Sequence, residues 1–330
     1  MRVAKSMGGR KATAAIVAAA ATVGLIGSSI GSGDASAAGV IAKDRYVTSC
    51  GMPTGNALGK GNPKGRVKVQ TWMRPGNKRT VILLDGLRAE YGTSGWFQQT
   101  NAWRLVNQGV NVVMPVGGPA SFYTDWDAPS NFNGQRARYR WGCVIDKGVV
   151  PMLRRAGFGS KNGKYALAGV SAGGNAALTH AAQRRDLYYA AASFSGYNYL
   201  SAPGMRTALR VAMLDVAPGP WNVDAMWGPP WSPRWTQNDP AMLINRMHGL
   251  KVFVGSGNGF FGKYNYPQNV GDDLFKGTPL EMLAWTQAKA FEVSAQVQGL
   301  PVMTYDANGT HAWGYWRDML FNAKRRGLFN

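Results

Sequence analysis

The chain has 330 residues, 45% of them hydrophobic and 16% charged, which supports a sizeable buried core and excludes a disordered protein. Its 43 glycines keep no every-third-residue spacing, which excludes collagen, and no internal period indicates a solenoid or a propeller. Lys and Arg number 37 against 17 Asp and Glu, and the net charge of +20 favours an anionic partner. Because the basic residues are scattered and match no nucleic-acid-binding motif, we expect an anionic envelope surface and no nucleic acid.

Residues 1–38 predict a secretory signal peptide. Four basic residues come first, a nearly uncharged run rich in Ala and Val follows to residue 31, and small residues end the segment. We expect cleavage after Ala37 or Ala38, which removes the four basic residues and Asp34 and lowers the net charge to +17. The alternative is a membrane anchor, but the strongly apolar part is shorter than the about 20 residues that span a bilayer. No later stretch predicts a transmembrane segment, so we expect a secreted protein associated with the cell envelope.

The two cysteines, Cys50 and Cys143, are candidates for a disulfide because an even cysteine count in an exported protein favours pairing. The alternative is a pair of unbonded, buried thiols. A bridge would close a long loop and stabilise the fold by about 4–5 kcal/mol in the chain-entropy model. With no histidine nearby, the cysteines do not fit a zinc ribbon, and we expect neither metal nor cofactor.

After the signal, residues 39–65 are rich in Gly, Lys and Asn and predict an extended leading segment. An edge strand is predicted at 67–73 because apolar and polar residues alternate there. The chain then predicts, in order, a buried strand at 79–85, a helix at 96–107, a buried strand at 110–116, a loop at 117–138 and a helix at 140–155. A strand at 164–170, a helix at 172–184 and a strand at 189–195 follow.

Residues 197–248 change character, since prolines interrupt them and four tryptophans cluster there, and they predict a lid-like insertion of short helices. A strand at 251–255, a long helix at 279–298, a strand at 301–305 and a final helix after His311 complete the chain. Strands that alternate with helices predict one α/β domain over residues 39–330, with a mostly parallel sheet covered on both faces.

Gly169-Val170-Ser171-Ala172-Gly173 is a G-x-S-x-G motif between a predicted strand and a predicted helix. This is the context of a nucleophile elbow, where small neighbours allow a sharp turn and the helix N-terminus faces a developing oxyanion. An ordinary glycine-rich turn is the alternative. We interpret Ser171 as a catalytic nucleophile.

A serine nucleophile needs a base, and the chain has only His180, His248 and His311. In proteins with this motif the histidine follows the last strand, a position that only His311 occupies. His180 lies on the helix after the nucleophile and His248 ends the predicted insertion, so we expect both to be surface or packing residues. The acid stays open from composition alone. Its candidates are Asp272, Asp273 and Glu281, with Asp306 as an outsider.

An oxyanion hole needs two backbone N–H groups. The sequence places one at Ala172, directly after the nucleophile, and the other in the loop 85–88 after an early strand.

Several stretches together resemble the secreted mycolyltransferases of the antigen 85 complex and their corynebacterial relatives. These stretches are LLDGLRA at 83–89, GW at 95–96, MPVGGPASFYTDW at 114–126, GVSAGG at 169–174, LE at 280–281 and NGTHAWGYW at 308–316. The resemblance implies an α/β-hydrolase fold. It also implies mycolyl transfer from trehalose monomycolate to a second trehalose monomycolate, giving trehalose dimycolate, or to cell-wall arabinogalactan.

The resemblance also assigns roles to residues. It implies Ser171 as nucleophile, Glu281 as the acid and His311 as the base of a triad. It implies Leu87 and Ala172 as oxyanion donors, and Asp85, Arg88 and Trp313 as contacts of the trehalose. The chain has Ala172 and Ala312 where mycobacterial members usually carry Met and Ser, and its cysteines do not match their close pair, so a corynebacterial enzyme fits better.

Three other functions remain open from the sequence. A secreted carboxylesterase or lipase would use the same triad and release free acid. A non-enzymatic envelope-binding protein would retain an inactive triad. A related transferase would acylate protein serines or arabinan instead of trehalose.

Overall fold

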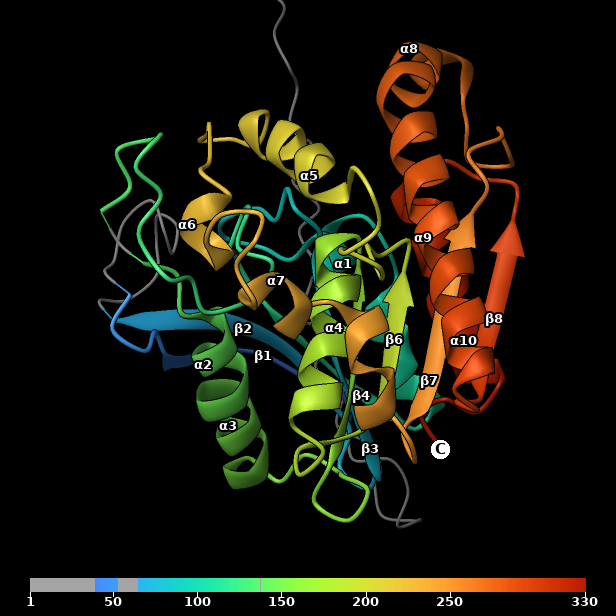
Figure 1. Cartoon of the computed structure of the whole chain (residues 1–330). Coiled ribbons are helices and arrows are strands. Elements are labelled where there is room, and N and C mark those ends of the chain that lie inside the picture. The colour runs from blue at the N-terminus through green and yellow to red at the C-terminus, as the bar shows by residue number, and fades with distance from the viewer. Residues whose placement is uncertain (1–38, 53–64, 137) are drawn as a thin grey trace, which may run out of the picture. The chain divides into compact units, whose positions relative to one another are not determined.

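The computed structural model describes residues 39–52, 65–136 and 138–330, and the predicted signal peptide lies outside them. Their eight strands form one sheet in the order β1-β2-β4-β3-β5-β6-β7-β8 (Figure 1). β2 is antiparallel to both β1 and β4, and every other neighbouring pair is parallel. The prediction of a mostly parallel sheet is therefore confirmed.

The strands are β1 (Ile41–Thr48), β2 (Arg66–Met73), β3 (Arg79–Leu84), β4 (Val110–Pro115), β5 (Tyr165–Val170), β6 (Tyr188–Phe194), β7 (Lys251–Gly257) and β8 (Val302–Ala307). The central strands β4, β5 and β6 are buried along their whole length, because their near-continuous apolar runs lie under helices on both faces.

The helical segments (η marks 3-10 or π geometry) are α1 (Gly95–Gln98), η1 (Ala102–Gln108), α2 (Trp141–Cys143), η2 (Val144–Val149), α3 (Val150–Arg155), α4 (Ala172–Gln183), α5 (Met205–Leu214), α6 (Asp224–Trp227), α7 (Arg234–Gln237), η3 (Pro240–Arg246), η4 (Pro267–Asn269), α8 (Val270–Asp272), η5 (Asp273–Gly277), α9 (Thr278–Val297) and α10 (Trp313–Arg325). One apolar core packs α3, α4 and α9 against the sheet. The other core packs η1 and α10 against the opposite face.

Two predicted elements were wrong in detail. The leading segment contains β1, which pairs along its whole length with β2, so β1 and not β2 is the edge strand. The helix predicted over 96–107 is instead one turn of α1 followed by η1. Thr100 interrupts it, because its hydroxyl donates to the Trp96 carbonyl and accepts from the Ala102 amide.

The predicted disulfide is confirmed, since Cys50 and Cys143 are bonded with their Cα atoms 6.1 Å apart. The short helices predicted between 197 and 248 are present as α5, α6, α7 and η3. Among the described helices, none combines the length and the apolar character needed to cross a membrane.

Candidate active site

Ser171 lies on the turn between β5 and α4, with φ 53° and ψ −122°. This left-handed φ is uncommon for a residue with a side chain and marks a strained turn. The flanking glycines are required by close backbone approach. A Cβ on Gly169 would lie 2.3 Å from the carbonyl oxygen of Gly173, and a Cβ on Gly173 would lie 2.2 Å from that of Asp85. The local structure is therefore that of a nucleophile elbow.

Two backbone amides near Ser171 are suitable for an oxyanion hole. A Cβ on Gly86 would lie 3.4 Å from the Cβ of Ser171, so the loop after β3 contacts the elbow. Within the described residues, neither the Leu87 N–H nor the Ala172 N–H donates to a protein acceptor. Ala172 is also the first residue of α4, where the helix dipole favours negative charge.

His311 and Glu281 form a buried pair. Nδ1 of His311 lies 2.7 Å from Oε2 of Glu281, and the Glu281 side chain is completely buried in the first turn of α9. The other oxygen, Oε1, accepts from the Ser195 hydroxyl at 2.6 Å and from the Gly257 amide at 2.5 Å. The carboxylate is thus held in one orientation, and it holds the imidazole in turn.

The other acid candidates do not reach the imidazole. Asp272 and Asp306 pair with Lys276 and Lys289 at the surface. Asp273 forms no ion pair within the described part of the chain. Glu281 is the only carboxylate there within ion-pair distance of the His311 ring.

Aromatic rings pack along one side of the imidazole. The Trp316 ring meets His311 edge-on at 4.8 Å, and its indole N–H donates to the Ser195 hydroxyl at 3.0 Å. Trp313 packs edge-on against Trp316 at 5.0 Å and against Trp96 at 5.6 Å. These rings form an apolar wall that includes Trp313 and limits access of water to His311, and a sugar contact of Trp313 stays a prediction.

The nucleophile and the His311–Glu281 pair lie at the same edge of the sheet. The Ser171 amide donates to the carbonyl of Phe194, and the next residue, Ser195, donates its hydroxyl to Glu281. Between the described side chains, however, no hydrogen bond joins Ser171 Oγ to the imidazole. Such bonds are often long before substrate binds, so the arrangement permits a triad without completing it.

Tyr197 lies beside both parts of the site. Burial raises the pKa of its phenol, the Ser171 side chain partly offsets this rise, and the negative charge of Glu281 adds to it. Tyr197 therefore stays protonated, with its hydroxyl available as a hydrogen-bond donor near the nucleophile.

Asp85 and Arg88 differ in their access to a ligand. The buried carboxylate of Asp85 accepts from the Ser94 hydroxyl at 2.9 Å and from the Gly95 amide at 3.0 Å, so it holds the start of α1. Burial raises the pKa of Asp85 to about 6. Arg88 is half-exposed and pairs with Asp215 at 3.1 Å. A sugar contact stays a prediction for both residues, and Arg88 has the exposed side chain.

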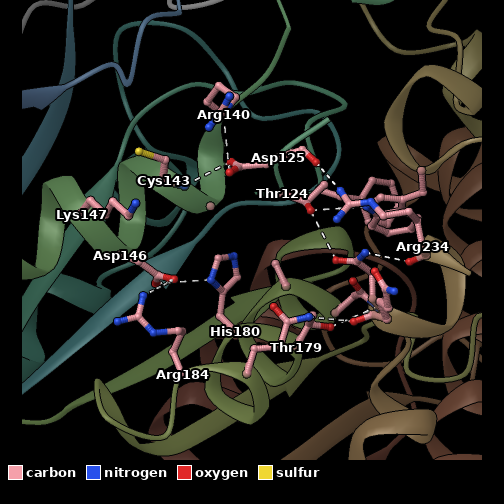
Figure 2. Close-up of a pocket in the computed structure, with 18 residues that line it drawn as sticks. Thr124, Asp125, Arg140, Cys143, Asp146, Lys147, Thr179, His180, Arg184 and Arg234 are labelled. Atoms are coloured by element: carbon pink, nitrogen blue, oxygen red, sulfur yellow. Dashed lines mark hydrogen bonds and ion pairs between the residues drawn. The ribbon is translucent and has the colours of Figure 1, made fainter. Parts of the chain in front are cut away.

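The remaining histidines lie away from the nucleophile. Nε2 of His180 is 2.9 Å from the carbonyl oxygen of Tyr123, and Nδ1 is 3.4 Å from Asp146. Burial lowers the pKa of His180, but the charge and hydrogen bond of Asp146 and the smaller effects of Tyr123 and Asp125 together outweigh burial, so the net shift is upward. Figure 2 shows this pair in a polar cavity of about 250 Å³ that none of Ser171, Glu281 and His311 lines. His248 is exposed.

Sequence reasoning missed Ser195, Gly257 and Trp316. The first two stand at the carboxyl ends of β6 and β7, the same sheet edge as Ser171, so the rule that ligands bind at strand ends would have drawn attention to them. Trp316 lies in the stretch quoted for the resemblance, but no local signal indicates its contact with Ser195, which is 121 residues away.

The chain is similar in sequence to known proteins over most of its length. Residues 62–326 match the family model "Putative esterase". The chain is 33% identical to diacylglycerol acyltransferase/mycolyltransferase Ag85C of Mycobacterium avium, over 92% of this chain and 84% of the relative. It is 32% identical to Ag85B of Mycolicibacterium smegmatis, over 93% and 91% respectively.

A solved structure supports the same fold. The crystal structure of MPT51 (FbpC1) of Mycobacterium tuberculosis superimposes with a TM-score of 0.66 at 22% identity, over 84% of this chain and 96% of that one. Sequence identity above 30% over most of both proteins, together with the α/β-hydrolase architecture, shows that this chain belongs to the antigen 85 family of diacylglycerol acyltransferases/mycolyltransferases.

Proposed function

We propose that this acyltransferase moves a mycolyl group from trehalose monomycolate to a second trehalose monomycolate or to arabinogalactan, through an acyl-enzyme on Ser171. The observation that carries the proposal is the buried His311–Glu281 pair at the sheet edge where the elbow holds Ser171. Ala172, Ala312 and the positions of the two cysteines fit a corynebacterial enzyme better than a mycobacterial one, and such an enzyme would use the shorter corynomycolates.

In the first half-reaction, Ser171 Oγ attacks the ester carbonyl carbon and its proton moves to Nε2 of His311. Glu281 keeps Nδ1–H oriented and stabilises the imidazolium. The amides of Leu87 and Ala172 donate to the oxyanion. The C–O bond to trehalose then breaks, and the sugar oxygen takes the proton from His311.

In the second half-reaction, a sugar hydroxyl of the acceptor replaces trehalose. His311 removes its proton, the hydroxyl oxygen attacks the acyl carbon, and Ser171 leaves with the proton returned to it. Transfer exceeds hydrolysis only if the acceptor is positioned better than water. We assign that positioning to Arg88 and Trp313, with Asp85 holding the loop that carries Leu87. The predicted signal peptide and the basic net charge are consistent with an enzyme that acts at an anionic cell envelope.

The test is to incubate purified enzyme with trehalose monomycolate and identify products and protein adducts by mass spectrometry. We expect trehalose dimycolate and an acyl adduct on Ser171, and neither with Ser171→Ala. Ser294→Ala is the matched control, since Ser294 lies in the body of α9 and its hydroxyl donates to the Ala290 carbonyl one turn earlier in the same helix. Free mycolate without dimycolate would instead support a carboxylesterase, which the match to the esterase family model also permits.

A further inference from the structure

An unusual group of exposed apolar side chains lies between β7 and the body of α9. We call residues 260–282 the apolar tip. Phe275 and Phe260 are 78% and 70% exposed. The exposed Phe, Val, Leu and Met side chains of the tip are Phe260, Phe261, Val270, Leu274, Phe275 and Met282. Single exposed apolar residues need no explanation, but six within one segment of 23 residues indicate an interaction surface.

The apolar tip projects from the molecule, and backbone and side-chain hydrogen bonds connect its base to the candidate site. Figure 1 shows α8 and the start of α9 extending beyond the ends of β7 and β8. At its base, the Thr278 hydroxyl donates to the Gly259 carbonyl at 2.9 Å, and the His311 amide donates to the Gly277 carbonyl at 3.1 Å. Whatever surface the tip contacts is therefore brought close to His311.

The exposed charges of the tip are paired, and Asp273, which forms no ion pair among the described residues, is half-buried with Oδ2 out of contact with solvent. Lys276 pairs with Asp272 at 3.1 Å, and Lys263 pairs with Asp318 at 2.5 Å. An apolar phase can cover the tip without taking up an unpaired charge. The rest of the molecule supplies long-range attraction, because the net charge is +17 after loss of the predicted signal peptide.

We propose that the apolar tip docks the enzyme on an anionic lipid surface. A strongly basic protein with a small apolar projection whose exposed charges are paired has the features of a protein that binds at a lipid interface. A protein partner fits less well, because the six exposed Phe, Val, Leu and Met side chains of the tip are far fewer than the about 20–30 residues a side of a stable interface. The inference rests on the proposed function for its purpose: docking at the tip would hold His311 beside glycolipids whose acyl chains lie in that surface.

The test measures binding to vesicles made of equal parts phosphatidylcholine and phosphatidylglycerol, by co-sedimentation and without turnover. The wild type should bind, and less at high salt. The double variant Phe260→Ser/Phe275→Ser should bind on the order of a hundredfold more weakly, because each lost phenyl group removes about tenfold of partitioning.

Val293→Ser/Val297→Ser is the matched control. These residues lie near the far end of α9, and their side chains are 61% and 81% exposed. The control should bind vesicles as the wild type does. Hydrolysis of p-nitrophenyl butyrate, a short soluble ester, shows whether each variant is folded. If the double variant does not fold, the single variant Phe275→Ser takes its place.

Three results would overturn the docking proposal: no vesicle binding by active wild type, an equal loss in the tip and control variants, or a change of oligomeric state in the tip variant. The last would make the tip an interface between copies of the chain. Normal vesicle binding without transfer from trehalose monomycolate would instead overturn the proposed function and leave the docking intact.

Discussion

Glu281→Gln is the sharpest test of the candidate triad, because the replacement keeps the volume and changes one proton. Oε1 of Glu281 accepts from Ser195, Ser256 and Gly257, so the Gln carbonyl oxygen should take that side. The Gln NH₂ group would then face Nδ1 of His311. A donor there selects the tautomer with its proton on Nε2, which cannot accept the proton of Ser171.

The expected loss is large because the site offers no substitute acceptor. The Glu281 side chain is completely buried, and no other described carboxylate lies within ion-pair distance of His311. The equivalent change in a Ser-His-Asp triad lowers kcat by about 10⁴-fold, or ~5 kcal/mol of transition-state stabilisation. We expect the same order here for both acylation and transfer.

The assay is kcat for p-nitrophenyl butyrate and for trehalose monomycolate, with Tm measured in parallel. Asp306→Asn is the matched control, since Asp306 is one of the alternative acids and its surface pair with Lys289 is worth about 0–1 kcal/mol. The control should keep wild-type activity. A folded Glu281→Gln enzyme within about tenfold of wild-type kcat would refute the role assigned to Glu281.

Three further predictions concern stability. Gly173→Ala should lower the free energy of unfolding by about 1–3 kcal/mol or more, because the added Cβ would lie 2.2 Å from the Asp85 carbonyl oxygen. Gly271→Ala is the control and should not, since nothing lies within 4 Å of a Cβ there. Equal urea midpoints for the two variants would contradict this prediction. Replacing both Cys50 and Cys143 with Ser should cost about 4–5 kcal/mol in urea unfolding, since the bridge spans 93 residues, and an unchanged midpoint would show that the loop model fails here. Burial raises the pKa of Asp85 from 3.8 to about 6, so its favourable contribution is full below pH ~4 and is lost as pH rises through about 6. Asp85→Asn should therefore destabilise more at pH 4 than at pH 7, by on the order of 3 kcal/mol, and an equal loss at both pH values would count against the shift.

The candidate nucleophile and base could be predicted from the residues themselves because their signals are local. Ser171 sits in a five-residue motif, and His311 is the one histidine after the last strand. Composition alone left the acid open, since five carboxylates lie between 272 and 306. Only the resemblance implied Glu281, and tertiary packing brings this residue to the imidazole. Ser195 and Trp316 were missed for the same reason, because their contacts join segments far apart in the chain.

The errors in the fold have a different physical cause. β1 is exposed at six of its eight positions, so its sequence lacks the apolar alternation that announces a half-buried strand. We expected one helix at 96–107, but side-chain hydrogen bonds divide this segment. The Asp85 carboxylate accepts from the backbone amides at the start of α1, and the Thr100 hydroxyl donates to the Trp96 carbonyl, so a short α1 is followed by a separate η1. Pattern reasoning detects burial, and it does not detect side chains that compete for backbone groups.

The position of the disulfide has a consequence for handling the protein. Cys50 lies two residues beyond the end of β1, so the bond fastens the outermost strand, most of whose residues are exposed, to the helix that begins at Trp141. If reduction let β1 detach, the unpaired backbone groups of β2 would become a template for strands of other molecules. Refolding in a reducing buffer should therefore favour aggregation, and an oxidising compartment protects the solubility of this enzyme as well as its stability.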